Sequence, residues 1–204
     1  MSEANPVFPL LSALAGVYAA EPREEAGRTA RVLVEDGPLH LGAPQPAPPE
    51  ASAMRALLAA SDHPAARALL EGFDLVPWGR NDVEGTQAVG ISAVATLLDP
   101  HGPIPVTDLS MGVFYQYPNT YYPLHNHDAD ETYVIVAGSA VWTAGDDTRP
   151  RGAGDVIHHP SLMPHAFRTG PEGLIALWRW SGDINSHSYA FLPDAQVAAA
   201  ATVA

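Results

Sequence analysis

The 204-residue sequence contains no cysteine and no lysine. Without cysteine there is no disulfide, thiolate metal site or cysteine nucleophile, so any bound metal must be held by nitrogen and oxygen atoms. All ten basic residues are arginine, and against 23 acidic residues they leave a formal net charge of −13. Nucleic acids and anionic membranes attract positive surfaces, so this excess of negative charge argues against both as partners.

Long apolar runs are also missing. No stretch approaches the roughly 20 apolar residues that cross a bilayer. The apolar segment 7–20 follows residues 2–5, which carry no positive charge, unlike the start of a secretory signal. With 47% hydrophobic and 16% charged residues, the sequence can bury a core of its own. These features predict a soluble, cytoplasmic protein.

Residues 1–85 are predicted to form a helical extension. Apolar residues recur at helical spacing in segment 7–20, and Pro22 ends that run. The apolar run 31–34 is too short to assign. Four prolines within residues 42–49 then predict a stiff connector without helix or strand.

Two more helices are expected after this connector. One spans residues 50–60, and the other is capped by Asp62, with Pro64 in its first turn and Gly72 at its end. Exposed apolar stripes of this size are unusual on a soluble monomer, so we expect these to pack on the rest of the chain or, in part, to form a homodimer contact. The stripes consist of Leu57, Leu58, Leu69, Leu70 and Phe73.

Residues 86–204 are predicted to be β-structure. Short apolar runs are separated by Gly, Pro, Asn and Asp, at 88–98, 112–117, 131–142, 155–158 and 174–180. Runs this short with regular turn residues are typical of an antiparallel sandwich or barrel. The lack of helical segments between them argues against a parallel β-α-β arrangement.

The segment 121–133 carries the residues that indicate metal chemistry. His125 and His127 would share one face of a strand, because side chains alternate between faces. Glu131 can add a carboxylate oxygen from the next strand, and His165 can add a third imidazole. Three nitrogens and one oxygen suit one divalent transition metal: Fe(II), Mn, Ni or Zn.

The spacing of these residues resembles the two signature motifs of the cupin superfamily. The matching pattern is His125-x-His127-x3-Glu131-x6-Gly138 followed by Gly154-x5-Pro160-x4-His165. The resemblance implies a mainly β fold, a single cupin barrel (double-stranded β-helix or jelly roll) of two antiparallel sheets behind the helical extension. It also implies that His125, His127, Glu131 and His165 are the metal ligands inside the barrel.

Three motif positions depart from the family pattern. Asn119 stands where the first motif usually opens with glycine, Leu162 replaces the glycine two residues after Pro160, and Thr169 replaces the closing asparagine. These changes concern turn geometry, while all four ligand positions are kept.

The residues around the ligands have a narrower resemblance. Tyr122, Tyr133 and the run Trp178-Arg179-Trp180 are similar to the cupin-type dimethylsulfoniopropionate lyases. The resemblance implies that the substrate carboxylate binds at the metal and that Tyr133 removes the α-proton. Dimethyl sulfide then leaves from the β-carbon, giving acrylate. Tyr122 would be a supporting catalytic and substrate-binding residue.

Tyr133 lies two residues beyond Glu131, so on a strand both side chains face the same side. A free tyrosine has a pKa near ~10, and a nearby cation lowers it enough for the phenolate to act as a base. The other interpretation is that Tyr133 only packs the barrel. Tyr121 and Tyr122 must face opposite ways, so one of them points inward.

The tryptophans and the remaining histidines of this region allow two interpretations each. Trp178 and Trp180 share a face, where they either belong to the core or wall a substrate pocket. In the second case a sulfonium cation would gain roughly 0.5–2 kcal/mol by cation–π attraction. His158 and His159 are interpreted as rim residues rather than ligands.

The resemblance thus implies a metal-dependent carbon-sulfur lyase with a small-molecule substrate. A cupin dioxygenase or isomerase on another substrate would use the same ligands, and a non-catalytic cupin would only bind a small molecule. Four intact ligands argue against the non-catalytic alternative. A sugar-phosphate isomerase is disfavoured because the barrel offers few cations: Arg149, Arg151, Arg168 and Arg179.

Overall fold

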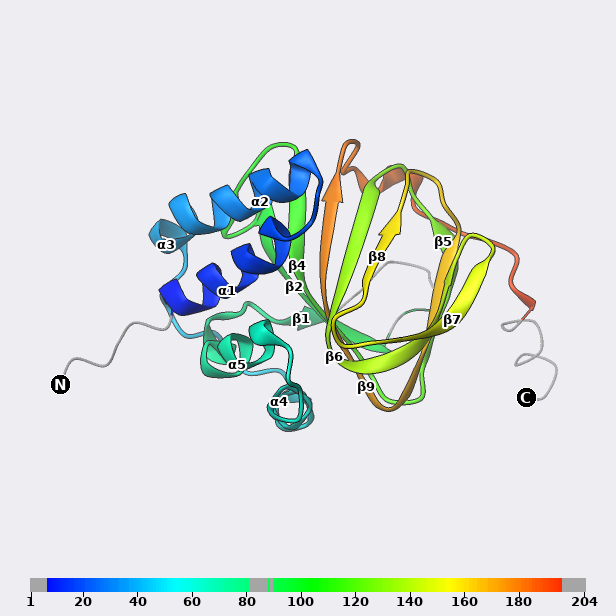
Figure 1. Ribbon diagram of the computed structural model, residues 1–204, viewed down its shortest axis with the longest axis horizontal. Helices are drawn as coiled ribbons and strands as arrows, with labels where there is room; N and C mark the ends of the chain where they lie inside the picture. The colour runs from blue at the N-terminus through cyan, green and yellow to red at the C-terminus, as the bar shows by residue number, and fades with distance from the viewer. Residues whose placement is uncertain (1–6, 81–87, 89, 196–204) are drawn as a thin grey trace.

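A computed structural model describes residues 7–80, 88 and 90–195, and Figure 1 shows a group of helices beside a β-barrel. The helices of the described residues are α1 (Val7–Ala19), α2 (Glu24–Glu35), α3 (Gly37–His40), α4 (Ala51–Ala59) and α5 (Pro64–Glu71), with 3₁₀ turns η1 (Phe73–Leu75) and η2 (Ser186–Ser188). No helix among them is long and apolar enough to cross a membrane.

The helices agree with the predicted extension in outline. The first helix ends before Pro22, and residues 42–49 have neither helix nor strand, as predicted. Of the apolar residues in α1, Leu10 and Leu14 belong to the buried stripe, and Phe8 is 59% exposed. The unassigned run 31–34 belongs to α2, whose buried face consists of Ala26, Thr29, Ala30 and Leu33, so that Leu33 is its only large apolar side chain.

The start of α5 corrects one prediction. His63, not Asp62, is the N-cap, because its Nδ1 accepts a hydrogen bond from the Ala65 backbone N–H at 3.2 Å. Pro64 occupies the first turn, and Gly72 is the C-cap, as predicted.

The strands of the described residues form one curled sheet. They are β1 (Gly79–Arg80), β2 (Ser92–Asp99), β3 (Ile104–Pro105), β4 (Leu109–Gln116), β5 (Tyr121–Asn126), β6 (Asp130–Ala144), β7 (Asp147–Gly152), β8 (Val156–His159), β9 (His165–Ser181) and β10 (Ala190–Phe191). All pairs are antiparallel except the short contact between β2 and β3. The predicted mainly β cupin fold with N-terminal helices is confirmed.

The two longest strands, β6 and β9, pair with each other along most of their length and bend together near the middle, which curls the sheet into a barrel. The first half of β6 pairs with the second half of β9, and the second half of β6 pairs with the first half of β9. The bend lies at Gly138 and Gly173, whose φ values are 77° and 79°. A Cβ atom on Gly138 would lie 2.1 Å from the Gly173 carbonyl oxygen, so only glycine fits there. The bend brings Glu131 and His165, at the starts of the two strands, to the same end of the barrel.

The two departures from the motif glycines keep the glycine backbone conformation. Asn119 has φ 54° and Leu162 has φ 64°, and these are the only non-glycine residues with positive φ in the described chain. The Leu162 N–H donates to the His127 carbonyl oxygen at 2.8 Å. The turn beside the ligands therefore persists, although leucine is unfavourable in the left-handed region.

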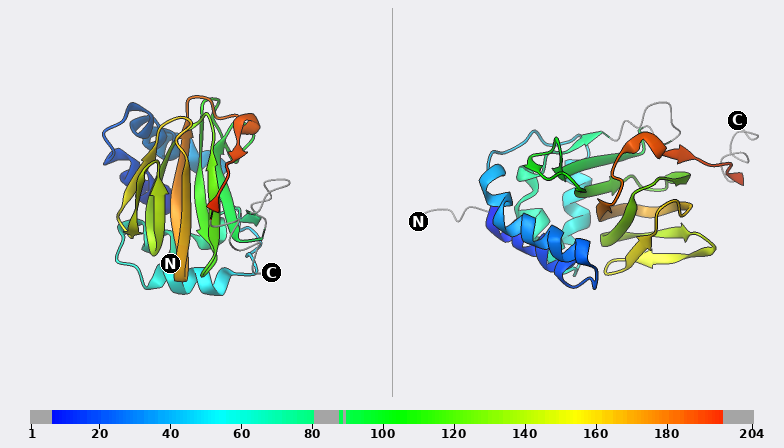
Figure 2. Two further views of the ribbon diagram at one scale, coloured as in Figure 1. Left: turned by 90° about the vertical axis from the view of Figure 1, so that its right-hand side faces the viewer. Right: turned by 90° about the horizontal axis from the view of Figure 1, so that it is seen from above.

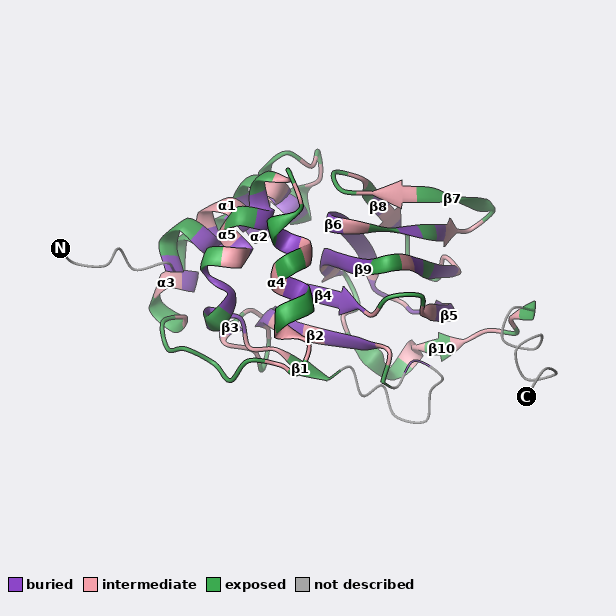
Figure 3. Ribbon diagram, turned by 90° about the horizontal axis from the view of Figure 1, so that it is seen from below, coloured by how far each residue is buried: buried purple, intermediate pink, exposed green. Residues whose placement is uncertain are grey.

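Two apolar cores organise the molecule. Figure 2 shows from the side and from above that the helices lie against one side of the strands, and Figure 3 marks buried residues in both parts. The larger core lies between the helices and the outer face of β2, β4 and part of β9, and it includes Leu14, Leu58, Leu69, Met111 and Leu177. The smaller core fills the barrel with aromatic side chains, including Phe114, Tyr133, Trp142 and Phe167. The predicted division between residues 85 and 86 lies outside the described residues.

Candidate metal centre and active site

The four predicted ligands lie together inside one end of the barrel. His125 is on β5, His127 follows that strand, Glu131 is on β6 and His165 begins β9; each is 2% exposed or less. One ligand atom from each of the three histidines lies within 4.8 Å of the other two. The Glu131 Oε2 atom lies 3.3 Å from His127 Nε2 and 3.1 Å from His165 Nε2.

Each of the three imidazoles is oriented by a backbone carbonyl two residues away. The Nδ1 atoms of His125, His127 and His165 lie 2.7, 3.1 and 2.9 Å from the carbonyl oxygens of Pro123, Ala129 and Met163. Because a carbonyl only accepts, Nδ1 carries the proton in each ring and donates it. Each Nε2 is then left with a lone pair, which is the usual arrangement of a metal-ligating histidine.

These lone pairs make a cation the natural occupant of the site. The unprotonated Nε2 atoms of His127 and His165 face the Glu131 carboxylate, so hydrogen-bond acceptors lie against one another in a buried space. The buried His165 Nε2 atom has no hydrogen-bond partner among the described residues. Three nitrogens and a carboxylate oxygen fit a divalent transition metal.

The charge states of the ligands agree with this fit. Burial and the neighbouring His165 hold the pKa of His125 well below its ordinary value, so the ring stays neutral. Burial alone would raise the pKa of Glu131, but His127, His159 and His165 more than offset it, and the pKa lies well below the ordinary value. His125 therefore contributes a neutral imidazole beside the buried carboxylate of Glu131.

Two residues outside the predicted ligand set contact Glu131, and one of them, His159, differs from its predicted position. His159, interpreted as a rim residue, is 1% exposed, and its Nδ1 lies 3.3 Å from Glu131 Oε2, so that prediction is wrong. His158 does point away, toward Asp130 Oδ2 at 2.8 Å. The Trp180 Nε1–H donates to Glu131 Oε1 at 2.6 Å, so this side chain contacts a candidate ligand as well as lining the interior.

The two candidate catalytic tyrosines both lie in the barrel interior. Tyr122 is 4% exposed and its ring centroid is 4.8 Å from that of His125, whereas Tyr121 points outward to Asp194. Tyr133 is 7% exposed and packs against Trp142. Burial, and after it the charge of Glu131, raises the pKa of Tyr133 well above its ordinary value.

Tyr189 is a site residue that the sequence did not reveal. It comes from the segment after η2, and its ring stacks on His125 with a centroid distance of 5.0 Å. Its hydroxyl lies 2.9 Å from that of Tyr122. No motif or spacing marks Tyr189, because only the pairing of β10 with β5 brings this segment back over the ligands.

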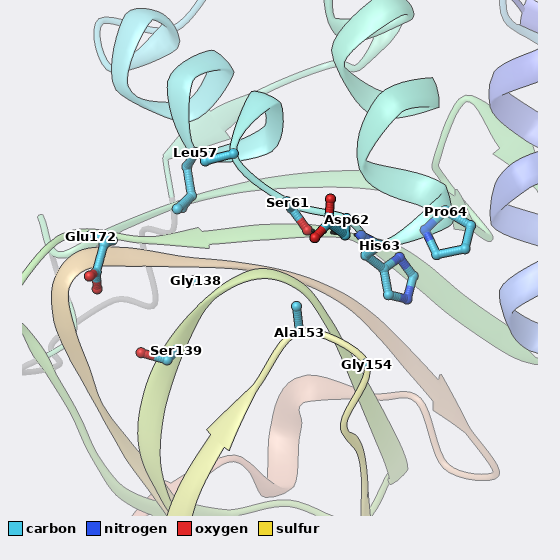
Figure 4. A pocket seen from close by; sticks show the side chains of 11 residues that line it. Leu57, Ser61, Asp62, His63, Pro64, Gly138, Ser139, Ala153, Gly154 and Glu172 are labelled. Carbon is cyan, nitrogen blue, oxygen red and sulfur yellow. Dashed lines mark hydrogen bonds between the residues drawn. The ribbon is translucent and has the colours of Figure 1, made fainter.

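A separate cavity of about 710 Å³ lies at the bend of the barrel, between the α4–α5 connection and the turns near Gly138 and Gly154 (Figure 4). Ser61, His63 and Glu172 contribute polar side chains to it. None of the candidate ligands lines this cavity, so it is distinct from the histidine cluster.

Comparison with known proteins points to one family. The model of the dimethylsulfoniopropionate lyase family matches residues 24–176. Dimethylsulfoniopropionate lyase DddQ of Ruegeria pomeroyi is 36% identical over 102 residues, which cover 50% of this chain and 51% of that protein. The aligned segment thus spans about half the length of this curated relative.

Solved structures agree over most of the chain. The crystal structure of DMSP lyase DddQ from Ruegeria pomeroyi DSS-3 superposes with a TM-score of 0.63 at 28% identity, covering 92% of this chain and 97% of that one. A second structure, from the DMSP lyases RdDddP and RnDddQII, has a TM-score of 0.70 at 24% identity, covers 92% and 98% of the two chains and indicates the fold. The chain belongs to the dimethylsulfoniopropionate lyase family.

Proposed function

We propose that the protein is a metal-dependent carbon-sulfur lyase that cleaves dimethylsulfoniopropionate to dimethyl sulfide and acrylate. The observation that carries the proposal is one buried interior with two kinds of groups: a cluster of His125, His127, Glu131 and His165, and the phenols of Tyr122 and Tyr133. Elimination from a sulfonium acid asks for a Lewis acid and a base, and this interior offers candidates for both.

The four ligands would hold Fe(II), Mn, Ni or Zn, because their atoms are nitrogen and carboxylate oxygen. When bound, such an ion attracts the substrate carboxylate and stabilises negative charge that develops at the α-carbon. The family membership of the chain and the name of its Ruegeria relative support the choice of substrate.

Tyr133 is the proposed base. Burial, and after it the Glu131 charge, raises the pKa of its hydroxyl. The sulfonium group of the substrate brings positive charge into the same interior, which favours loss of the phenol proton to solvent and gives the phenolate. The phenolate oxygen then takes the α-proton, the C–H electron pair forms the carbon–carbon double bond, and the C–S bond breaks with its pair on sulfur. Dimethyl sulfide leaves neutral and needs no acid.

Tyr122 and the tryptophans are proposed to hold the substrate. The Trp178 Nε1–H is buried and has no hydrogen-bond partner among the described residues, so it is a donor that a ligand can use. The ring of Trp180 lies 4.4 Å from that of His127, measured between centroids, so it borders the metal cluster. Tyr122, bonded to Tyr189, completes an aromatic wall against which a sulfonium would gain roughly 0.5–2 kcal/mol.

The test is headspace detection of dimethyl sulfide after dimethylsulfoniopropionate is added to metal-loaded protein, for the wild type and for Tyr133→Phe. The phenylalanine keeps the ring volume, so fold and metal content should stay unchanged while kcat falls ~10²–10⁴-fold. Activity within a few-fold of wild type would remove Tyr133 as the base and make Tyr122 the next candidate. A metal-loaded wild type that releases no dimethyl sulfide would exclude the proposed substrate.

A further inference from the structure

The cluster contains a fourth buried histidine, His159, that the proposed mechanism does not use. We infer that His159 is a positioning residue: it holds the Glu131 carboxylate in its ligand orientation through an N–H whose place on the ring is dictated by Trp142. The inference rests on the proposed metal site.

The contacts of His159 form a chain through the barrel interior. His159 ends β8, where it is in register with Glu131 on β6. Its Nδ1 lies 3.3 Å from Glu131 Oε2, and its Nε2 lies 3.0 Å from Trp142 Nε1. Both His159 and Trp142 are 1% exposed, so water does not compete for these bonds.

Trp142 determines the protonation of the His159 ring. An indole N–H can only donate, so His159 Nε2 must present its lone pair to it. The single proton of the neutral ring is then on Nδ1, where it donates to Glu131 Oε2. The carboxylate accepts this bond and faces the ligand cluster with its remaining lone pairs.

The hydrogen bond from Trp142 also excludes His159 as a metal ligand. A ligand atom of His159 lies within 4.8 Å of those of Glu131 and His165, which is close enough for a shared ion. Ligation through Nδ1 would require a bare Nδ1 and a protonated Nε2, which would set two N–H groups against each other at Trp142. His159 therefore acts on the site through Glu131.

Glu131 is thereby held at both oxygens. Trp180 Nε1–H donates to Oε1 at 2.6 Å, and His159 Nδ1–H donates to Oε2. The His159 ring is stacked on His165 with centroids 4.0 Å apart and planes 10° apart, so it has little freedom to turn. Such partners of a ligand typically change metal affinity by about 10–100-fold.

Two substitutions separate the two nitrogens of His159. In His159→Asn the amide nitrogen takes the place of Nδ1 and keeps the donor to Glu131, but the acceptor for Trp142 is lost. In His159→Gln the amide oxygen takes the place of Nε2 and keeps the acceptor for Trp142, but the donor to Glu131 is lost. The probe is zinc alone, titrated in competition with a fluorescent chelator, and melting of the zinc-free proteins checks that both variants fold.

We expect zinc affinity to fall about 10–100-fold in His159→Gln and to stay within a few-fold of wild type in His159→Asn. Equal affinities in wild type and His159→Gln would overturn the inference and leave the metal site intact. Equal losses in both variants would also overturn it, because they would indicate a ligand or packing role. A wild type that binds no zinc would refute the metal site itself.

A measurement on the unaltered chain does not depend on how the variants fold. In ¹⁵N NMR spectra of zinc-loaded wild-type protein, His159 Nδ1 should carry a directly bonded proton while Nε2 is unprotonated. A His159 Nδ1 without a proton would overturn the inference.

Discussion

A buried ion pair between Glu21, just after α1, and Arg179 on β9 joins the helices to the barrel. Arg179 is completely buried, the Glu21 side chain is 6% exposed, and Nη1 and Nη2 of Arg179 lie 2.7 and 3.1 Å from the two carboxylate oxygens. Arg179 Nη2 also donates to Thr132 Oγ1 at 3.2 Å, directly beside Glu131. The pair therefore links the helical segment to the strand that carries a candidate ligand.

Glu21→Gln keeps the volume of the side chain and removes its charge. It leaves a buried guanidinium without its countercharge, which typically costs about 3–5 kcal/mol. Each kcal/mol shifts the melting temperature of a chain of this size by roughly 2–4 °C, so Tm should fall by roughly 6–20 °C.

The matched control is Glu71→Gln. Arg67 Nε lies 2.8 Å from Glu71 Oε1, but these side chains are 86% and 54% exposed. A solvated pair of this kind contributes less than about 1 kcal/mol to stability. Its N–O distance is similar to that of the Glu21–Arg179 pair, but its loss should cost much less. The assay is thermal and urea denaturation followed by circular dichroism.

A double variant tests whether the lone charge is the cause. Glu21→Leu combined with Arg179→Met replaces both charges by apolar groups and should recover most of the lost stability, because replacing a whole buried pair is often neutral. If Glu21→Gln destabilises no more than Glu71→Gln, the pair does not hold the helices to the barrel, and this reasoning is wrong.

Three further predictions follow from the site and the fold. The purified protein should carry close to one divalent transition metal per chain by elemental analysis, and His165→Ala should lose it, since this residue belongs to both buried ligand groups; an unaltered metal content in the variant would contradict this. Gly138→Ala should lower the free energy of unfolding by more than ~2 kcal/mol, because the new Cβ atom would meet backbone atoms at a residue in the left-handed region. Gly27→Ala, at a helical glycine with open space around it, should raise the free energy of unfolding by roughly 0.5–1 kcal/mol. Similar effects at both positions would contradict the role given to Gly138 in the bend. Burial lowers the pKa of His63, and protonation of its ring would remove the cap of α5. The stabilisation from this cap is therefore present above the unfolded pKa of about 6.5 and is lost as pH falls through the lower folded value. Between pH 7.5 and pH 5, the free energy of unfolding of His63→Asn should fall by about 1 kcal/mol less than that of wild type in denaturation experiments.

The candidate ligands could be predicted because their spacing is local. His125 and His127 are two residues apart at the end of one strand, and Glu131 follows after a short turn. His165 is further away, and only its place in the second motif connected it with the others. The same locality explains the correct end of α5 at Gly72, where a single residue type marks the helix end.

The partners of Glu131 could not be predicted in the same way. His159 is 28 residues from Glu131 and Trp180 is 49 residues away, so their contacts depend on how β8 and β9 align with β6. A shift of one residue in either register would turn the side chain to the other face of the sheet. Sequence spacing does not determine these registers, and His159 was therefore misplaced on the rim.

This difference divides the candidate metal site into two parts that should differ in their sensitivity to changes elsewhere in the fold. The three imidazoles depend on carbonyls two residues away, so each ring keeps its orientation as long as its own turn is formed. The carboxylate of Glu131 depends on two N–H groups from other strands, and one of these, at Trp180, lies next to the buried Arg179. Loosening of the barrel, or of its contact with the helices, should therefore disturb the oxygen ligand before the nitrogen ligands. We therefore expect the stability of the helical segment and the geometry of the candidate metal site to be coupled through one strand, β9, whose alternating side chains face the two cores in turn.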